Sequence, residues 1–290
     1  MRGVILAGGF GSRLFPTTKS MNKHLIPVYD KPMIYYPLTT LILAGAKDIC
    51  IVSTPQGVEG IKNLLGDGTE FGIKLEYKTQ DLPRGITDGI NVALSSFREY
   101  EPILVILGDN IFYGPGLGRA ISEAINPSMT TIWTQEVSNP QDFGIITIDS
   151  NGTIMSIKEK PSESDSNLAI TGLYYLSIDL PELITDISPS VRGEIEITSL
   201  LERFHNNNSL NVKFLSRGIY WTDAGTVDNL SNASQFIKLI QTRQGNLIGS
   251  PHEAAYQTGL ISKSELISLM VKMPDSDYKN SLQRYFGFLV

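Results

Sequence analysis

VILAGGFGSRLFPT at residues 4–17 joins an apolar segment to a glycine-rich loop, and Lys23 follows a few residues later. The apolar segment is typical of a buried parallel strand, and its carboxyl end leads directly into Gly8, Gly9 and Gly11. Ligands of parallel α/β sheets bind beyond the carboxyl ends of the strands, and glycines let backbone N–H groups approach an anion closely. The stretch therefore predicts an α/β fold with an anion-binding loop at the edge of its sheet.

The loop departs from both common phosphate-binding patterns. A dinucleotide-binding loop reads G-x-G-x-x-G and opens a helix, and a P-loop reads G-x-x-x-x-G-K-[ST]. Arg13 and the Pro16-Thr17 pair fit neither pattern. A plain glycine turn is the alternative, but Arg13 offers a planar fork for phosphate oxygens and Lys23 a compact positive charge. Two cations this close to a glycine loop favour phosphate binding.

The composition narrows the class of protein. Hydrophobic residues make up 41% of the 290 residues, and the net charge of −6 argues against a nucleic-acid-binding surface, which would be basic. Cys50 is the single cysteine and lies in an apolar run, so we expect a core position and no disulfide within the chain. The N-terminus lacks the long apolar core of a signal peptide, and no uncharged apolar run reaches the roughly 20 residues that span a membrane. We therefore expect a cytoplasmic location.

The first 130 residues alternate between strand and helix patterns. We predict strands at 2–6, 48–53, 74–78 and 102–107 and helices at 32–46 and 86–97. This β-α-β-α order is typical of a mostly parallel sheet that helices cover on both faces.

From about residue 130 the pattern changes to closely spaced strands. Asn151-Gly152 is a hairpin signal between two of them. We predict strands at 130–137, 144–149, 153–158, 168–177 and 212–215, helices at 196–205 and 226–241, and further helices from Pro251 onward. The simplest architecture is an α/β domain with a Rossmann-like, mixed but mostly parallel central sheet and a small C-terminal helical appendage.

Two aspartates follow predicted strands. Asp109 comes after the apolar strand at 103–107, and Asp223 comes after a strand-like run at 219–222. Each alone could equally cap a turn. Mg²⁺ in proteins is normally held by one or two carboxylates together with phosphate oxygens and water, so a metal site is the other interpretation.

The longer motifs resemble a known family. The pattern L-A-G-G-x-G-x-R-L-x-P-T-x-x-x-x-x-K, which ends at Lys23, is similar to the signature of the sugar-nucleotide pyrophosphorylases. The segment at 25–38 narrows the resemblance to the glucose-1-phosphate thymidylyltransferases. The resemblance recurs at 108–110, 159–161, 171–174, 192–198 and 221–226, and so spans nearly the whole chain.

The resemblance implies a fold, an activity and partners. The fold would be that of the nucleotide-diphospho-sugar transferases, in one domain with a nucleotide-binding half at 1–130, a sugar-binding half at 131–226 and a helical region at 227–290. The activity would be transfer of a thymidylyl group from dTTP to α-D-glucose 1-phosphate, giving dTDP-glucose and pyrophosphate by in-line attack on the α-phosphate, as the first step of dTDP-deoxysugar synthesis (for example dTDP-rhamnose). The family uses Mg²⁺ and forms homotetramers. The alternatives are the same chemistry with UTP or an amino-sugar 1-phosphate, or a non-catalytic nucleotide-binding regulatory subunit.

The same motifs imply the site residues. By resemblance Arg13, Lys23 and Lys160 are catalytic, and Asp109 and Asp223 hold the Mg²⁺. The implied nucleotide-binding residues are Gly8, Gly9, Gly11, Ser12, Arg13, Lys23, Gln80, Gly85 and Asp109, with Gln80 and the Gly85 backbone reading the thymine. The implied sugar-phosphate-binding residues are Asn110, Gly144, Glu159, Lys160, Ile170, Thr171, Tyr174, Arg192 and Trp221. The alternative for Glu159 and Lys160 is that they are solvated charges at a strand end, and the alternative for Trp221 is a core position. We expect no catalytic role for any histidine.

The chain departs from the family pattern near the nucleotide. The sequence at 86–89 replaces the usual Leu-Ala-Gln-Ala, which introduces Asp88, and His24 replaces a glutamine. We therefore expect looser selectivity for dTTP over UTP.

A second departure concerns regulation. A dTDP-rhamnose site between subunits is common in the family, and Arg217, Glu253 and Ala254 match its positions. Gly118 and Arg119 replace a histidine and an acidic residue of that site, so feedback inhibition is not a firm expectation.

Overall fold

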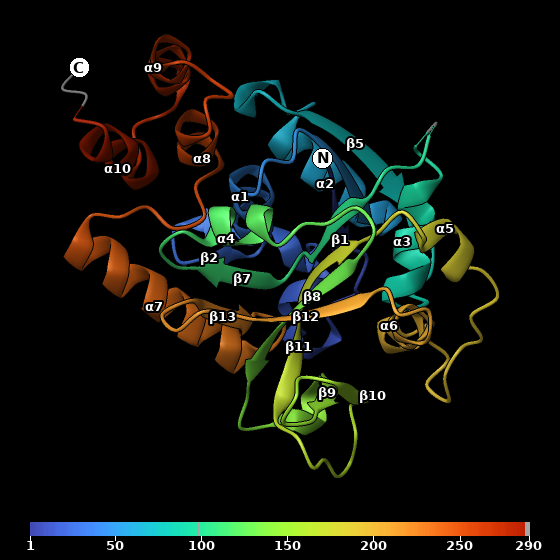
Figure 1. The fold of residues 1–290 in the computed structure, drawn as a ribbon. Coiled ribbons are helices and arrows are strands. Elements are labelled where there is room, and N and C mark those ends of the chain that lie inside the picture. The colour runs from blue at the N-terminus through green and yellow to red at the C-terminus, as the bar shows by residue number, and fades with distance from the viewer. Residues whose placement is uncertain (98, 288–290) are drawn as a thin grey trace.

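A mixed sheet of nine strands forms the centre of the computed structural model, which describes residues 1–97 and 99–287 (Figure 1). Its parallel part runs in the order β6-β1-β4-β5. The four strands are β1 (Arg2–Ala7), β4 (Asp48–Ser53), β5 (Lys74–Thr79) and β6 (Ile103–Leu107). They confirm the predicted parallel strands to within one residue at each end.

The second half of the chain extends the sheet from the free edge of β6. There β11 pairs antiparallel with β6, β8 and β9, and the β9–β10 hairpin reaches away from the C-terminal helices (Figure 1). These strands are β8 (Thr130–Glu136), β9 (Gly144–Ile148), β10 (Ile154–Glu159), β11 (Leu168–Leu176) and β12 (Leu210–Phe214), which pairs parallel with β8. The mixed central sheet is therefore confirmed, and so is the hairpin turn at Asn151-Gly152.

Helices cover both faces of the sheet, as predicted. Neighbouring side chains of a strand point to opposite faces, so fully buried Val4 and Ile5 of β1 belong to two different cores. The Ile5 core includes residues of α1 (Tyr35–Leu43), α2 (Pro55–Leu65), α4 (Leu117–Glu123), α8 (Pro251–Gln257), α9 (Lys263–Lys272) and α10 (Asp277–Tyr285). The Val4 core includes residues of α3 (Ile86–Leu94), α5 (Leu180–Leu183) and α6 (Ile197–Asn206), and it contains Cys50 at the predicted buried position.

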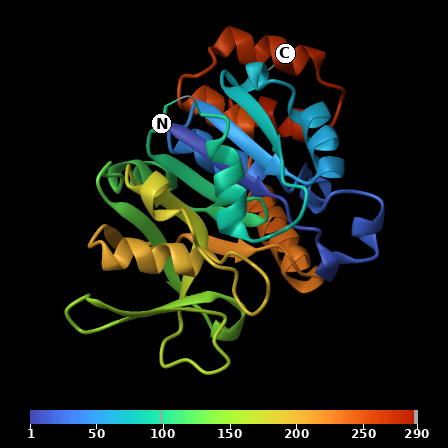
Figure 2. The same cartoon turned by 90° about the vertical axis from the view of Figure 1, so that its right-hand side faces the viewer.

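Short elements complete the fold. Two small sheets pair β7 (Asn110–Tyr113) with β13 (Tyr220–Asp223) and β2 (Pro27–Val28) with β3 (Lys31–Pro32). Helix α7 (Val227–Gln244) packs against both, and α8 to α10 lie together at the far end of the molecule from β9 and β10 (Figure 2). Single 3₁₀ turns are η1 (Ser12–Leu14), η2 (Thr17–Lys19), η3 (Lys23–Leu25), η4 (Thr69–Phe71) and η5 (Pro140–Asp142).

The helix predicted at 32–46 is too long. Pro32 pairs with Pro27 in the small β2–β3 ladder, so α1 begins only at Tyr35. Gly45 follows the end of α1 with a φ of 92°, a left-handed conformation that stops helices. The helix predicted at 86–97 likewise ends earlier, at Leu94.

The sequence analysis missed α2 altogether. Its start carries ordinary signals, because Pro55 is the first helical residue and the Thr54 side chain accepts a hydrogen bond from Gly57 N. Two glycines inside the helix, Gly57 and Gly60, weaken the pattern. Among the described residues, no helix has the length and apolarity needed to cross a bilayer.

Candidate active site

The glycine loop leaves β1 at the carboxyl edge of the parallel strands. It passes through η1 and η2, and η3 then brings Lys23 back to the sheet, where its Nζ donates to Asp109 Oδ2 at the end of β6. This contact joins residues that are 86 positions apart in the chain. The fold thus brings Lys23, at the end of the glycine loop, into contact with Asp109, which follows β6. The sequence predicts each residue's position but not their contact.

Two cavities adjoin at this point. The first, the loop cavity, has a volume of about 270 Å³ and is lined by Leu6, Gly8, Gly9, Arg13, Lys23, His24, Gln80, Pro83, Gly85, Ile86, Gly89, Leu107, Asp109 and Glu194. The second, the strand-end cavity, has a volume of about 160 Å³. Its lining is Arg13, Ile86, Leu107, Asp109, Asn110, Asp142, Phe143, Gly144, Glu159, Lys160, Ile170, Gly172, Tyr174, Ile197, Thr198, Trp221 and Asp223. Arg13, Ile86, Leu107 and Asp109 line both cavities.

Cations and carboxylates alternate where the cavities adjoin. Arg13 Nη2 lies 3.7 Å from Asp223 Oδ2, and Lys23 pairs with Asp109. Burial opposes ionisation of Asp109, but the charge and hydrogen bond of Lys23, together with smaller contributions that include the Asn110 hydrogen bond, outweigh burial and hold the pKa of that carboxyl below its usual range. Burial, and then the negative charge of Asp109, raises the pKa of Asp223. The two carboxylates therefore face one another with only part of their repulsion compensated.

The pairing of β7 with β13 aligns the strand-end cavity. Asp223 stands opposite Asn110 in this ladder. Trp221 Nε1 donates to Asn110 Oδ1 over 2.7 Å, and Asn110 Nδ2 donates to Asp109 Oδ1 over 3.0 Å. Trp221 is 8% exposed and lines the cavity, so the core and pocket interpretations of this residue both apply. The Trp221 indole therefore fixes the orientation of the Asn110 amide, and this amide in turn fixes the orientation of the Asp109 carboxylate.

Glu159 and Lys160 face one cavity because the strand stops between them. Glu159 is the last residue of β10, and Lys160 adopts a φ of 41°, which breaks the alternation of the strand. Thr198 Oγ1 donates to Glu159 Oε2 over 3.2 Å. Burial, and then the nearby Glu196 charge, raises the pKa of Glu159. A partly buried carboxylate and a cation thus lie side by side at the end of β10.

His24 is a neutral hydrogen-bond acceptor beside the loop cavity. Burial, and then the Lys23 charge, lowers the pKa of His24 to about 3. Asn22 Oδ1 accepts from the His24 backbone N–H over 2.9 Å, so this atom is an oxygen and the Nδ1 only 2.8 Å away must donate to it. The proton of the neutral imidazole is therefore on Nδ1, and the unprotonated Nε2 is a hydrogen-bond acceptor.

Known proteins match this chain over most of its length. Residues 2–239 match the family described as nucleotidyl transferase. The chain belongs to the nucleotidyl transferase family. It is 40% identical to the glucose-1-phosphate thymidylyltransferase of Mycobacterium tuberculosis over 97% of this chain and 98% of that protein. It is 38% identical to the enzyme of the same name from Neisseria meningitidis over 98% of this chain and 99% of that one.

Solved structures of nucleotidyl transferases share the fold. A Bacillus anthracis protein named as a candidate glucose-1-phosphate thymidylyltransferase, in complex with a sucrose, is 36% identical, with a TM-score of 0.74 over 81% of this chain and 94% of that one. A UDP-glucose pyrophosphorylase complexed with UDP-glucose has a TM-score of 0.73 at 23% identity, over 83% and 99% of the two chains, and supports the fold alone.

This nucleotidyl transferase brings most of the expected site residues to the two cavities and leaves four outside. Gly11 and Ser12 belong to the loop but do not line either cavity. Thr171 is fully buried, and its hydroxyl donates to Trp133 O over 2.8 Å, so the neighbouring Gly172 borders the cavity instead. Arg192 lies outside as well, 3.1 Å from Glu194, 3.6 Å from Glu159 and 3.8 Å from Glu196.

Several lining residues escaped the sequence analysis. Thr198 and Glu194 belong to the motif at 192–198, so the resemblance could have indicated them. Phe143 stands next to Gly144, and its ring contacts Trp221 with centroids 5.3 Å apart. Asp142 and Pro83 carry no signal of their own, because only the folded chain brings their loops to the cavities.

Backbone hydrogen bonds join the two sides of the site. Ile195 N donates to Arg84 O over 2.6 Å, and Thr87 N donates to Ile195 O over 3.3 Å. Gly85 and Ile86, which lie between these two partners of Ile195, line the loop cavity. Ile195 itself follows Glu194 of the loop cavity and precedes the residues at 197–198 that line the strand-end cavity. A short ladder of backbone hydrogen bonds therefore joins the wall at 84–87 to the wall at Ile195.

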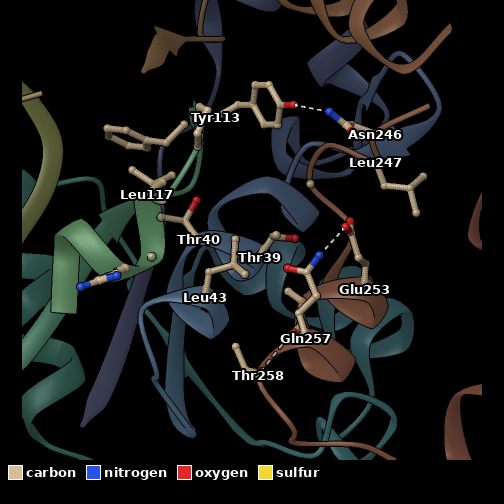
Figure 3. Close-up of a pocket in the computed structure, with 18 of the residues that line it drawn as sticks. Thr39, Thr40, Leu43, Tyr113, Leu117, Asn246, Leu247, Glu253, Gln257 and Thr258 are labelled. Atoms are coloured by element: carbon tan, nitrogen blue, oxygen red, sulfur yellow. Dashed lines mark hydrogen bonds between the residues drawn. The ribbon is translucent and has the colours of Figure 1, made fainter. Parts of the chain in front are cut away.

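A further cavity of the nucleotidyl transferase lies elsewhere (Figure 3). It has a volume of about 530 Å³ between α1, α4, β7 and α8, and Glu253, Ala254, Gly118 and Arg119 all line it, whereas Arg217 does not. Gln257 Nε2 donates to Glu253 Oε1 over 2.9 Å inside it. A Cβ on Gly118 would lie 2.3 Å from Leu43 O, so the packing of α4 on α1 excludes a side chain there.

Glu253, which lines this cavity, gives the stability of the protein a pH dependence that can be measured. Burial raises the pKa of Glu253 from 4.5 to about 7, so between these values the folded protein holds a proton that the unfolded chain releases. The free energy of unfolding that this proton contributes is lost as the pH rises. We expect Glu253→Gln to gain stability relative to the parent protein between pH 4.5 and pH 7, and the gain to level off above pH 7. Urea unfolding at several pH values measures it, and a difference that does not change with pH would contradict it.

Proposed function

We propose that this nucleotidyl transferase transfers a thymidylyl group from dTTP to α-D-glucose 1-phosphate and releases pyrophosphate. One observation carries the proposal: the loop cavity and the strand-end cavity adjoin at Arg13 and Asp109. A nucleotide in the first and a sugar phosphate in the second would meet at a cluster of cations and carboxylates. The names of relatives that match along nearly the whole chain support the choice of substrates.

The two cavities suggest which residues bind each substrate. In the proposal the glycine loop, Gln80 and Gly85 bind the nucleotide, and Glu159 and Lys160 bind the sugar phosphate. The nucleotide-binding half at 1–130 and the sugar-binding half at 131–226 both contribute to each cavity, because Glu194 lines the first and Arg13 lines the second. Arg192 would reach the sugar phosphate only after leaving its glutamate partners.

The reaction needs positioning and charge neutralisation rather than a base. A phosphate oxygen of the sugar attacks the α-phosphorus, a new P–O bond forms, and the bond to the β-phosphate oxygen breaks in line with it. The attacking phosphate is already ionised, since its second pKa lies at about 6. Arg13 and Lys23 would stabilise the charge that develops on the α-phosphate and the leaving pyrophosphate, and Lys160 would offset repulsion between the two substrates.

The residues present fit Mg²⁺. A Cβ built on Gly225 would lie 2.7 Å from Asp223 Oδ1 and 3.3 Å from Asp109 Oδ2, so both carboxylates border one small space. In the part of the chain that the structure describes, no group of three or more His, Cys, Asp or Glu side chains is arranged for a metal. Mg²⁺ suits such a site because it takes one or two carboxylates and completes its shell with phosphate oxygens and water. When bound by Asp109 and Asp223, it would offset the negative charge of the nucleotide phosphates.

A substrate matrix tests the proposed function. Pyrophosphate release is measured with Mg²⁺ for dTTP, UTP and dCTP, each with glucose 1-phosphate, galactose 1-phosphate and an amino-sugar 1-phosphate. We expect the highest kcat/KM with dTTP and glucose 1-phosphate, and a smaller preference for dTTP over UTP than the Mycobacterium tuberculosis relative gives when it is measured in the same assay. A higher kcat/KM for UTP or for the amino sugar would favour the alternative substrates, and no release with any pair would favour a non-catalytic subunit.

Two further expectations stay predictions. They are the homotetramer and the cytoplasmic location, and light scattering on the purified protein tests the first.

A further inference from the structure

The side-chain amide of Gln80 is anchored in one orientation. Gln80 is 6% exposed, and its Nε2 lies 2.7 Å from Asp88 Oδ2 and 3.3 Å from Gly85 O. A carboxylate and a backbone carbonyl can only accept hydrogen bonds, so the nitrogen of the amide must face both of them. The contacts thus fix which end of the amide is which.

This anchoring determines what Gln80 can offer a ligand. An amide nitrogen has two N–H groups, and Asp88 and Gly85 engage both. The carbonyl oxygen Oε1 is the polar atom that is left for the loop cavity, which Gln80 lines. Oε1 also lies against the glycine loop, because a Cβ built on Gly8 would be only 2.3 Å from it. Gln80 therefore faces the cavity as an acceptor.

We propose that Asp88 is a positioning residue, which holds the Gln80 amide as a hydrogen-bond acceptor and thereby selects a pyrimidine whose ring nitrogen carries a hydrogen. Thymine and uracil carry N–H at the ring position where cytosine carries a lone pair. A lone pair facing Oε1 would bury two acceptors against each other, which costs binding free energy. The inference rests on the proposed function for the assignment of the loop cavity to the nucleotide.

The positioning role of Asp88 and a purely structural role predict different effects on nucleotide binding. Asp88 is the third residue of α3, and a carboxylate in the first turn of a helix stabilises the helix by itself. Loss of that stabilisation would weaken binding of every nucleotide alike. Loss of the anchor would instead change the ratio between nucleotides, because only the base edge depends on the direction of the amide. The preference for dTTP over UTP should not change, since both bases carry the ring N–H.

Binding of dTTP and dCTP, measured by titration calorimetry without sugar phosphate, tests the inference. We expect Asp88→Ala to lower the ratio of the dCTP to the dTTP dissociation constant about tenfold, the effect of one hydrogen bond. Asp88→Asn should keep most of the ratio, because its Oδ1 still accepts while Gly85 O holds the amide nitrogen on the same side. Asp81→Asn, an exposed carboxylate in the same turn, is the matched control and should leave the ratio unchanged.

An unchanged ratio in a folded Asp88→Ala protein would overturn the inference. Asp88→Ser, which preserves a helix-starting side chain too short to reach Nε2, replaces the alanine variant if that variant does not fold. The outcomes are distinct from those of the proposed function. A protein that binds dTTP with the expected ratios but releases no pyrophosphate from dTTP and glucose 1-phosphate contradicts the proposed function alone.

Discussion

Lys23→Ala is expected to lower kcat about 10²–10³-fold, the usual cost of removing a donor that stabilises developing charge. The Lys23 ammonium sits at the loop cavity and pairs with Asp109, so its loss removes a positive charge from the leaving phosphates and leaves a buried carboxylate without its cation. Arg13→Ala should lose a similar factor, and Arg13→Lys should recover only part of it because lysine lacks the planar fork. Single-turnover pyrophosphate release with saturating substrates measures the effect.

The control for Lys23 is another lysine of the same loop. Lys19→Ala removes an exposed cation from η2 and should leave kcat unchanged. If Lys23→Ala released pyrophosphate at nearly the parent rate, the assignment of the loop cations to the reacting phosphates would be wrong.

Asp223→Asn should separate stability from activity. Burial and the Asp109 charge disfavour the ionised form of Asp223, so the neutral amide should raise the free energy of unfolding when no metal is present. The sign follows from the raised pKa of the folded state: the penalty is absent at low pH and grows as the carboxyl ionises, so the gain should be larger at pH 8 than at pH 4. The same variant should lose about 10²-fold or more in kcat, because one of the two carboxylates proposed to hold the metal is gone.

Asp109→Asn should lose activity to a similar extent but should not gain stability, since it leaves Lys23 buried without its partner. Thermal unfolding in EDTA and a Mg²⁺ titration of turnover measure the two effects. Asp228→Asn, an exposed carboxylate at the start of α7, is the control for activity. An Asp223→Asn protein with the parent's Mg²⁺ dependence would show that the metal is held elsewhere.

The sequence predicts those parts of the site in which motif and strand end coincide. The glycine loop follows β1, and Asp109 follows β6, so the rule that ligands bind at carboxyl ends places both without any long-range information. The pairing of Lys23 with Asp109 was beyond such reasoning, since it depends on the path of η1 to η3 back to the sheet.

Other features depended on contacts that no local pattern encodes. Thr171 and Gly172 are neighbours in a predicted strand, and only the packing of β11 on β8 decides which of them borders the cavity. Arg192 was expected at the sugar phosphate, yet it pairs with Glu159 from β10 as well as with Glu194 and Glu196 of its own segment, and only the first of these contacts is long-range. The helix α2 was missed because two interior glycines lower its helix propensity.

The short ladder between Ile195 and the residues at 84–87 has a consequence for engineering. Backbone hydrogen bonds join the wall proposed for the base to the wall proposed for the sugar, so a graft that changes the length or backbone path of either wall alone would break pairs that the other wall supplies. Exchange of nucleotide preference between relatives should therefore succeed only when the segments at 80–89 and 192–198 are transplanted together.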